Sequence, residues 1–311
     1  MNITVARFTK DYTLQWNEFL KTTKNQLFLF ERSYMEYHED RFTDHSLLIY
    51  KQDKLVGLFP ANEQEQSIYS HAGLTYGGLV FSQELKGLDA VLVLEAIIHY
   101  YREQGFKEIF YKAVPHIFHT YPSQEDLYAL FRIDALLYRR DISSVIELSN
   151  PIRFSETKRQ SISKCIKAGA TVKENNDFTE YWDLLSTVLS KFKTSPVHSL
   201  NEINHLKEKF VGKIRLFEAR LFGELLAGVI VYDYKTVVHT QYMASSTKGR
   251  TMGALDFINE TLITDEYKSR KFFSFGISTE QGGKVLNEGL IQQKEMMGGR
   301  AIVHDFYKII L

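Results

Sequence analysis

The chain contains the same strand pattern twice, and this internal repeat limits its fold more than any other feature. One copy spans residues 45–80 and the other spans residues 213–249. Each copy consists of an apolar stretch, a polar turn, a second apolar stretch that holds a glycine, another polar turn and a third stretch. Such short apolar runs separated by turn residues predict a meander of three antiparallel strands. The sequence therefore predicts two domains of similar architecture.

The segments after each meander also match. Helical apolar spacing, then a strand, then a second helix and strand follow both copies, so each half reads β-β-β-α-β-α-β. In the first half we expect helices over 91–101 and 124–133 and strands over 107–114 and 137–148. In the second half we expect helices over 253–267 and 281–293 and strands over 272–277 and 300–311, with three more helices over 155–168, 179–192 and 200–210 ahead of the meander.

The sequence places the domain boundary at Asn150–Pro151. A proline restricts the residue before it to extended conformations, so a boundary at that position costs little. We therefore expect an N-terminal domain over 1–150 and a C-terminal domain over 151–311, at the usual ~150 residues each.

Composition limits the classes of partner and compartment. The 38 Lys and Arg residues balance the 38 Asp and Glu residues, which argues against DNA binding by bulk charge but leaves a local basic groove open. The single cysteine, Cys165, excludes an intrachain disulfide and favours a reducing cytoplasm. No apolar run approaches the ~18–20 residues that cross a bilayer. We expect a cytoplasmic protein, with peripheral contact at the inner membrane face left open.

Several common chemistries have no motif in this sequence. No Cys/His cluster has metal-ligand spacing, and no nucleophile elbow, P-loop or dinucleotide fingerprint is present. His116 and His119 follow Pro115 in a turn-rich stretch, which favours a loop over a metal-binding helix. We therefore expect no metal.

Three antiparallel strands followed by helix, strand, helix and strand is the order of GNAT (acyl-CoA N-acyltransferase) domains. The chain resembles tandem GNAT-like acyltransferases, in particular the Fem (FemABX) aminoacyltransferase family and related double-domain proteins. The segment RQSISKCIKAGATVKE is similar to that family's basic helix before a short strand, and FGISTEQGGKVLNEGL and QKEMMGGR are similar to its C-terminal part. The resemblance implies an α/β (α+β) fold of two tandem GNAT-like domains, each a mixed, mostly antiparallel sheet with flanking helices.

The resemblance also implies a donor cleft in the C-terminal domain, where the fourth strand of a GNAT sheet diverges from the fifth. The segment that follows the fourth strand supplies candidate donor-binding residues: Lys248, Gly249, Arg250, Thr251, Met252 and Gly253. Flexible backbone, positive side chains and a helix N-terminus suit an anion such as a pyrophosphate. Leu255 stands where the GNAT pattern has glycine or alanine. A helix-entry segment with solvated charges is the alternative.

Lys294, just ahead of Gly298 and Gly299, is the main catalytic candidate. An ammonium at this place could stabilise the oxyanion of an acyl-transfer transition state. It could equally be a cation favoured by the dipole at a helix C-terminus. Glu280 and Tyr242 are candidates for the proton transfer that the attacking amine requires, and structural roles stay open for both.

The N-terminal half contains the glycine-rich segment GLTYGG at the exit of its meander. Glycines allow a ligand to approach the backbone, but no positive charge is present to hold a phosphate. We expect this segment to form a wall of the acceptor site, with a tightly packed bulge as the alternative. The candidate substrate-binding residues are His71, Thr75, Tyr76, Gly77 and Gly78.

These features predict an enzyme that moves an acyl or aminoacyl group from an activated donor to an amine on a small molecule or a cell-envelope precursor. The partial pyrophosphate motif favours acyl-coenzyme A as the donor. The basic helical segment favours aminoacyl-tRNA, through Lys158, Arg159, Lys164 and Lys167. A binding module that keeps the GNAT fold without the chemistry is the alternative from another class.

Overall fold

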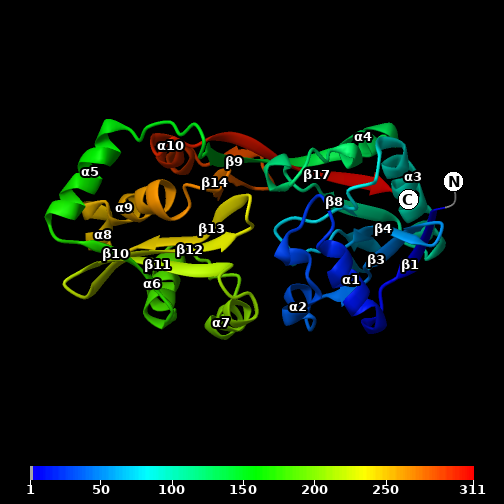
Figure 1. The fold of residues 1–311 in the computed structure, drawn as a ribbon, viewed down its shortest axis with the longest axis horizontal. Coiled ribbons are helices and arrows are strands. Elements are labelled where there is room, and N and C mark those ends of the chain that lie inside the picture. The colour runs from blue at the N-terminus through cyan, green and yellow to red at the C-terminus, as the bar shows by residue number, and fades with distance from the viewer. Residues whose placement is uncertain (1–2) are drawn as a thin grey trace. The chain divides into compact units, whose positions relative to one another are not determined.

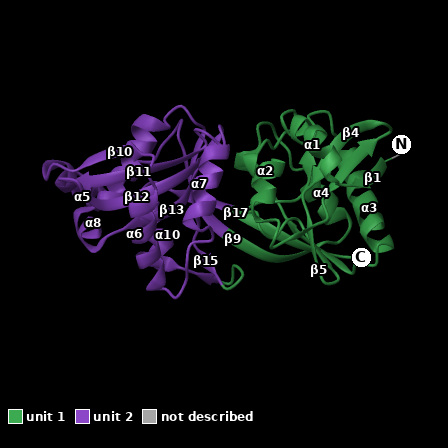
Figure 2. Ribbon diagram, turned by 90° about the horizontal axis from the view of Figure 1, so that it is seen from below, with its two compact units in different colours: residues 1–141, 281–284, 303–311 green, residues 142–280, 285–302 purple. Residues whose placement is uncertain are grey.

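The computed structural model describes residues 3–311 and divides into two compact units (Figure 2). Unit 1 is residues 1–141, 281–284 and 303–311, and unit 2 is residues 142–280 and 285–302. Two long strands contribute residues to both units: β9 (Leu136–Glu147) and β17 (Arg300–Ile310). None of the helices within residues 3–311 is both long and apolar enough to cross a membrane.

The sheet of unit 2 contains the predicted meander (Figure 1). Its strands are β10 (Thr171–Asn175), β11 (Ile214–Leu221), β12 (Glu224–Asp233), β13 (Val237–Ser245) and β14 (Phe272–Ile277). The first four pair antiparallel in chain order, and β14 then pairs parallel to β13. This order confirms the GNAT-like prediction for the second half.

Helices cover both faces of this sheet. They are α5 (Glu156–Lys167), α6 (Thr179–Ser190), α7 (Leu200–Lys209) and α9 (Ala254–Thr261), close to the predicted bounds. Figure 1 shows α5 and α9 on one face and α6 on the other. Cys165 of α5 is fully buried in the core between the helices and the sheet, which fits a structural role. Gly228 on β12 makes room for the ring of Tyr181 on α6, because a β-carbon there would lie 2.3 Å from a ring carbon.

In unit 1 the predicted meander is divided into two sets of shorter strands. One set is β1 (Ile3–Arg7), β3 (Leu47–Lys51), β4 (Lys54–Phe59) and β7 (Val80–Phe81). The other is β2 (Thr43–Asp44), β5 (Asn62–Gln64), β6 (Ser67–Tyr69) and β8 (Glu108–Lys112), with β6 parallel to β8. The unit's helices are α1 (Thr13–Leu20), α2 (Arg32–Met35), α3 (Gly87–Glu103) and α4 (Glu125–Arg132). The third strand of the prediction is interrupted by the loop 70–79.

The pairing of the two long strands differs from the prediction that each half is closed by its own last strand. Residues 143–147 of β9 pair antiparallel with β14 in unit 2. Residues 306–310 of β17 pair antiparallel with β8 in unit 1. Local periodicity identifies a strand but carries no information about its partner, so the sequence could not predict this exchange.

The helix predicted over 281–293 is wrong in its first half. Residues 279–286 form a small hairpin of β15 (Thr279–Glu280) and β16 (Val285–Leu286), and α10 (Glu288–Met296) begins only after Asn287. Gly282 and Gly283 have positive φ angles, 63° and 84°, which suit a turn and not a helix. The side chain of Asn287 caps α10 by accepting a hydrogen bond from the backbone N–H of Leu290 at 3.0 Å.

Gly57 and Gly228 occupy the second meander strand of each half and provide a matched test of packing. A β-carbon at Gly57 would make ordinary contacts of 3.5 Å or more, whereas one at Gly228 would clash with Tyr181. We expect Gly228→Ala to lower the free energy of unfolding by about 1–3 kcal/mol, the usual cost of overpacking. Gly57→Ala should change it by less than about 1 kcal/mol. Thermal unfolding of both variants measures this, and equal effects would contradict the packing described for α6.

Candidate active site

The strands β13 and β14 diverge in unit 2. They pair over only three registers, from Val237 opposite Phe272 to His239 opposite Ser274. Beyond that point β13 continues to Ser245 with a bulge, and β14 continues to Ile277. At the last paired register, Nδ1 of His239 lies 3.1 Å from the hydroxyl of Ser274. This divergence is the one that the GNAT resemblance implies between the fourth and fifth strands.

Lys294 lies in the last turn of α10 and is only 2% exposed. Its ammonium donates to the carbonyl oxygens of Gly276 at 2.9 Å and Ile277 at 2.7 Å. The third N–H has no partner within residues 3–311. Burial lowers the pKa of Lys294 from 10.5 to about 8. The lysine therefore holds the end of β14 just where that strand has left its partner, and is not a solvated helix-end charge.

The glycines after Lys294 are required by the local packing. Gly298 has a φ of 87°, and a β-carbon there would lie 2.3 Å from the carbonyl oxygen of Ile152. The N–H of Gly299 donates to the carbonyl of Lys294 at 3.0 Å and ends α10. The chain can turn into β17 at this point only because neither residue has a side chain.

Tyr242 lies on β13, beyond the last register that pairs with β14. Its hydroxyl oxygen lies 2.6 Å from Nδ1 of His198 and accepts a hydrogen bond from the backbone N–H of His198 at 3.3 Å. The ring makes an edge contact with Trp182. Burial raises the pKa of Tyr242, so the phenol is neutral near pH 7.

His198 is a residue that the sequence reasoning missed. It lies in the loop between α6 and α7, where no periodicity marks a site, and its partner Tyr242 is 44 residues further along the chain. Its side chain is 5% exposed. Only the fold shows that this loop places a titratable ring against a strand of the diverging pair.

Glu280 is exposed at the end of β15. Its carboxylate accepts a hydrogen bond of 2.7 Å from Nδ2 of Asn287, the residue that caps α10. This contact ties the small hairpin to the start of the helix. The structure shows no contact of Glu280 with Lys294 or Tyr242, so its candidate catalytic role stays a prediction.

The segment that we expected to be a flexible anion-binding loop is a short helix, α8 (Thr247–Met252). Ser246 caps it by accepting a hydrogen bond from the N–H of Gly249 at 3.0 Å. A β-carbon at Gly249 would lie 2.1 Å from the carbonyl oxygen of Leu226, so this glycine serves packing against β12. Gly253 ends α8 in the left-handed conformation. Anion binding by this segment stays a prediction.

The charged side chains of α8 lie at its surface. Lys248 forms an ion pair with Glu224, and Arg250 donates to the hydroxyl of Thr247 at 3.4 Å. The hydroxyl of Thr251 donates to the carbonyl of Thr247 within the same helix. Of these groups, Arg250 is the exposed cation without an ion pair among residues 3–311.

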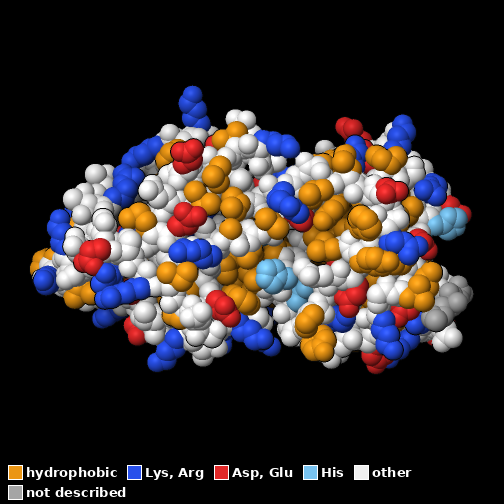
Figure 3. All heavy atoms as spheres, turned by 90° about the horizontal axis from the view of Figure 1, so that it is seen from above, with side chains coloured by type: hydrophobic (Ala, Val, Ile, Leu, Met, Phe, Trp, Pro, Cys, Tyr) orange, Lys and Arg blue, Asp and Glu red, His pale blue; other side chains and the backbone are white. Residues whose placement is uncertain are grey.

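The basic helix α5 divides into structural and solvated cations. Lys158 forms a mostly buried ion pair of 2.7 Å with Asp256 of α9, and Arg159 pairs with Glu156 on its own helix. Lys164 and Lys167 are exposed and have no ion pair within the described chain. Figure 3 shows Lys and Arg side chains gathered over the end of unit 2 where α5 lies.

In unit 1, the segment that we expected to line an acceptor site is mostly packed inward. Tyr76 is 1% exposed and contacts the ring of Phe118, and burial raises its pKa. A β-carbon would lie 2.0 Å from the carbonyl of Ser70 at Gly77 and 2.5 Å from the ring of Tyr111 at Gly78. These contacts favour the alternative of a tight bulge for Tyr76, Gly77 and Gly78.

Two residues of that segment are placed differently. Thr75 is exposed, and His71 is buried and lines a pocket described below. Lys112 fixes this part of the loop by donating to three carbonyl oxygens, those of His71, Ala72 and Leu74, at 3.1, 3.1 and 2.6 Å. Burial lowers the pKa of Lys112 to about 8.

Residues 3–311 contain no group of three or more His, Cys, Asp or Glu side chains that could hold a metal ion. His116 and His119 lie at a short 3₁₀ turn, as the sequence indicated.

No protein-family model and no curated protein matches the sequence. Among solved structures, the chain is similar to FemX, with 10% identity and a TM-score of 0.69 over 100% of this chain and 98% of that chain. It is also similar to L-PGS from Bacillus licheniformis, with 11% identity and a TM-score of 0.59 over 96% and 90% of the two chains. A tandem GNAT protein from the clavulanic acid biosynthesis pathway has 9% identity and a TM-score of 0.50 over 99% and 98%. The chain therefore has the Fem-like tandem GNAT fold that its motifs indicated.

The low pKa of Lys294 predicts how folding stability changes with pH. Between pH 8 and 10.5 the unfolded chain binds a proton at this lysine that the folded chain has lost, so folding stability should rise with pH across this window. We expect wild type to gain stability relative to Lys294→Met as the pH rises from 8 to 10. Lys112 titrates in the same range, but it is present in both proteins, so its contribution cancels in the difference between them. Urea unfolding at several pH values measures the difference, and a pH-independent difference would contradict the buried position of the ammonium.

Proposed function

We propose that this chain transfers an acyl or aminoacyl group from an activated donor to an amine. The Fem-like tandem GNAT fold supports acyl transfer as the class of reaction. The observation that carries the proposal is the buried ammonium of Lys294 at the end of β14, with two N–H groups fixed by carbonyls and one left over. An ammonium held in this way is preorganised to meet a negative charge.

Lys294 would act on the acyl carbonyl of the donor. When the amine attacks the carbonyl carbon, negative charge develops on the carbonyl oxygen. A hydrogen-bond donor that is already fixed in place stabilises that charge without reorganising. The carbonyls of Gly276 and Ile277 orient the ammonium, and its low solvent exposure strengthens the interaction. The lysine must be protonated for this role.

Tyr242 and His198 would transfer protons in this reaction. A neutral, buried phenol does not accept a proton readily. Tyr242 is therefore better suited to donate a proton to the leaving group than to act as a base for the attacking amine. The contact of 2.6 Å with Nδ1 of His198 gives the hydroxyl a route to recover its proton. Both groups lie on or against β13, one of the two diverging strands.

Different observations favour two different acyl donors. Exposed Lys164 and Lys167 on α5 favour a phosphate-rich donor such as aminoacyl-tRNA. Arg250 on α8 favours the pyrophosphate of acyl-coenzyme A, although the cap of α8 already uses the N–H of Gly249. The acceptor that we propose is an amine on a small molecule or a cell-envelope precursor, and the reaction would take place in the cytoplasm or at the inner membrane face.

A binding module without chemistry is the second candidate, and one observation favours it. Lys294 already makes two hydrogen bonds that hold the end of β14, and this structural contact would persist in a protein that catalyses nothing. The two candidates differ in whether the third N–H of Lys294 meets a reacting group.

Turnover of Lys294 variants separates these candidates. Wild type should transfer an acyl group to members of an amine panel from acetyl-coenzyme A or from charged tRNA. We expect Lys294→Met to lower kcat about 10²–10³-fold, the usual cost of removing one oxyanion donor. Lys21→Met, which removes an exposed lysine paired with Glu18, is the matched control and should keep full activity. Folded wild-type protein that is inactive with both donors would leave the binding module as the better account. A Lys294→Met variant with unchanged kcat would instead show an enzyme in which Lys294 has no catalytic role.

A further inference from the structure

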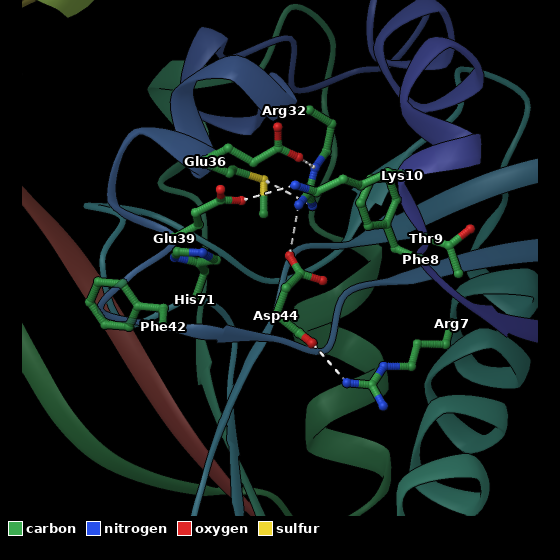
Figure 4. A pocket seen from close by; sticks show the side chains of 11 residues that line it. Arg7, Phe8, Thr9, Lys10, Arg32, Glu36, Glu39, Phe42, Asp44 and His71 are labelled. Atoms are coloured by element: carbon green, nitrogen blue, oxygen red, sulfur yellow. Dashed lines mark hydrogen bonds and ion pairs between the residues drawn. The ribbon is translucent and has the colours of Figure 1, made fainter.

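Unit 1 contains a pocket of about 200 Å³ that the proposed reaction does not use (Figure 4). It lies between the end of β1, α2 and the turn that follows α2. Phe8, Met35 and Phe42 provide apolar walls. Gly73 allows one of these walls to close, because a β-carbon there would lie 2.6 Å from the ring of Phe42.

His71 lies against this pocket with a polar atom that has no partner. The side chain is 2% exposed, and its Nδ1 makes no hydrogen bond within residues 3–311. Burial and nearby positive charges lower the pKa of His71, so the ring is neutral and carries one N–H donor. Its φ of 59° places the residue in the left-handed region, and Lys112 holds the carbonyl in place. A buried polar atom of this kind is normally satisfied, so it indicates a missing hydrogen-bond partner.

The charge of Arg32, at the base of the pocket, is already neutralised. Its guanidinium donates to Glu36 and to Asp44 at 2.9 Å each, and it stacks on the ring of Phe8 at 3.7 Å. The side chain is 3% exposed. Arg32 therefore builds the pocket and has little charge left for a ligand.

Most of the other charged residues at the pocket also have partners. Glu36 and Asp44 pair with Arg32, and Arg7 donates to the backbone carbonyl of Asp44 at 3.0 Å and lies 3.9 Å from Glu63 (Figure 4). Lys10 and Glu39 are two exposed charges of opposite sign at the rim. Lys10 and Glu39 approach each other to 3.5 Å, with side chains 81% and 60% exposed. An exposed pair of this kind contributes little to stability, so each partner can turn to a ligand at low cost.

We propose that this pocket binds a small zwitterion of amino-acid size with an apolar side chain. Its ammonium would lie toward Glu39 and its carboxylate toward Lys10, with the N–H of His71 as a further donor. The apolar walls would take its side chain. An anion alone would meet Glu39, and a cation alone would meet Lys10, so a molecule with both charges matches the rim best.

Binding of matched small molecules to the full chain tests this proposal. The probes are L-leucine, L-leucinamide, which lacks the carboxylate, and N-acetyl-L-leucine, which lacks the ammonium. We expect L-leucine to bind and each altered probe to bind about tenfold more weakly, the scale of one charge-assisted hydrogen bond. No binding of L-leucine at about 10 mM, or equal binding of all three probes, would overturn the proposal.

Variants locate the binding. Glu39→Gln should weaken L-leucine but not N-acetyl-L-leucine, because that probe has no ammonium for Glu39 to meet and its carboxylate is repelled by Glu39 in the wild type. His71→Asn should weaken L-leucine about tenfold, and asparagine tolerates the left-handed backbone at this position. Glu18→Gln removes an exposed glutamate of the same unit and is the control. Wild-type affinity in both pocket variants would overturn the proposal, and the result holds whether or not the chain is a transferase.

Discussion

The hydrogen bonds from Lys294 to the carbonyls of Gly276 and Ile277 are the contact on which the account of unit 2 depends. β14 pairs with β13 over three registers only, and its pairing with β9 shifts register between Ser274 and Ile277. Backbone carbonyls that leave a ladder away from water need another donor. Lys294 supplies it, so one ammonium stabilises the end of β14 at the place where this strand diverges from β13.

Lys112 plays a comparable structural part in unit 1. Lys294 is buried and Lys112 is half-buried, and in both the pKa is lowered to about 8 and the ammonium donates to backbone carbonyls. Lys112 uses all three N–H groups on the loop 70–79, whereas Lys294 uses two. The loop in unit 1 is also closed by Tyr111, whose hydroxyl accepts from the N–H of Leu79 and donates to Asp126. Lys112 therefore has no N–H left for another partner, whereas Lys294 has one.

The sequence was sufficient for features that depend on local pattern. The meander of unit 2, most of the expected helices and Lys294 near a helix end follow from apolar spacing and turn residues, and the structure confirms them. The helix expected over 281–293 is the exception, because it begins only at Glu288. Features that depend on contacts between distant residues could not be predicted, such as the exchange of β9 and β17 or the pairing of His198 with Tyr242. Gly249 of α8 and Gly77 and Gly78 of the loop 70–79 suggest a backbone that a ligand can approach, but each makes room for a neighbouring carbonyl or ring.

The pH dependence of turnover tests the role of Lys294 most directly. A protonated lysine is required if the ammonium stabilises an oxyanion, so kcat should fall as the pH rises through about 8, where burial has placed the pKa of Lys294. Lys294→Arg keeps a positive charge at every accessible pH and should show no such fall, even though Lys112 still titrates. A kcat that rises through pH 8, or an identical fall in the Lys294→Arg variant, would contradict the account.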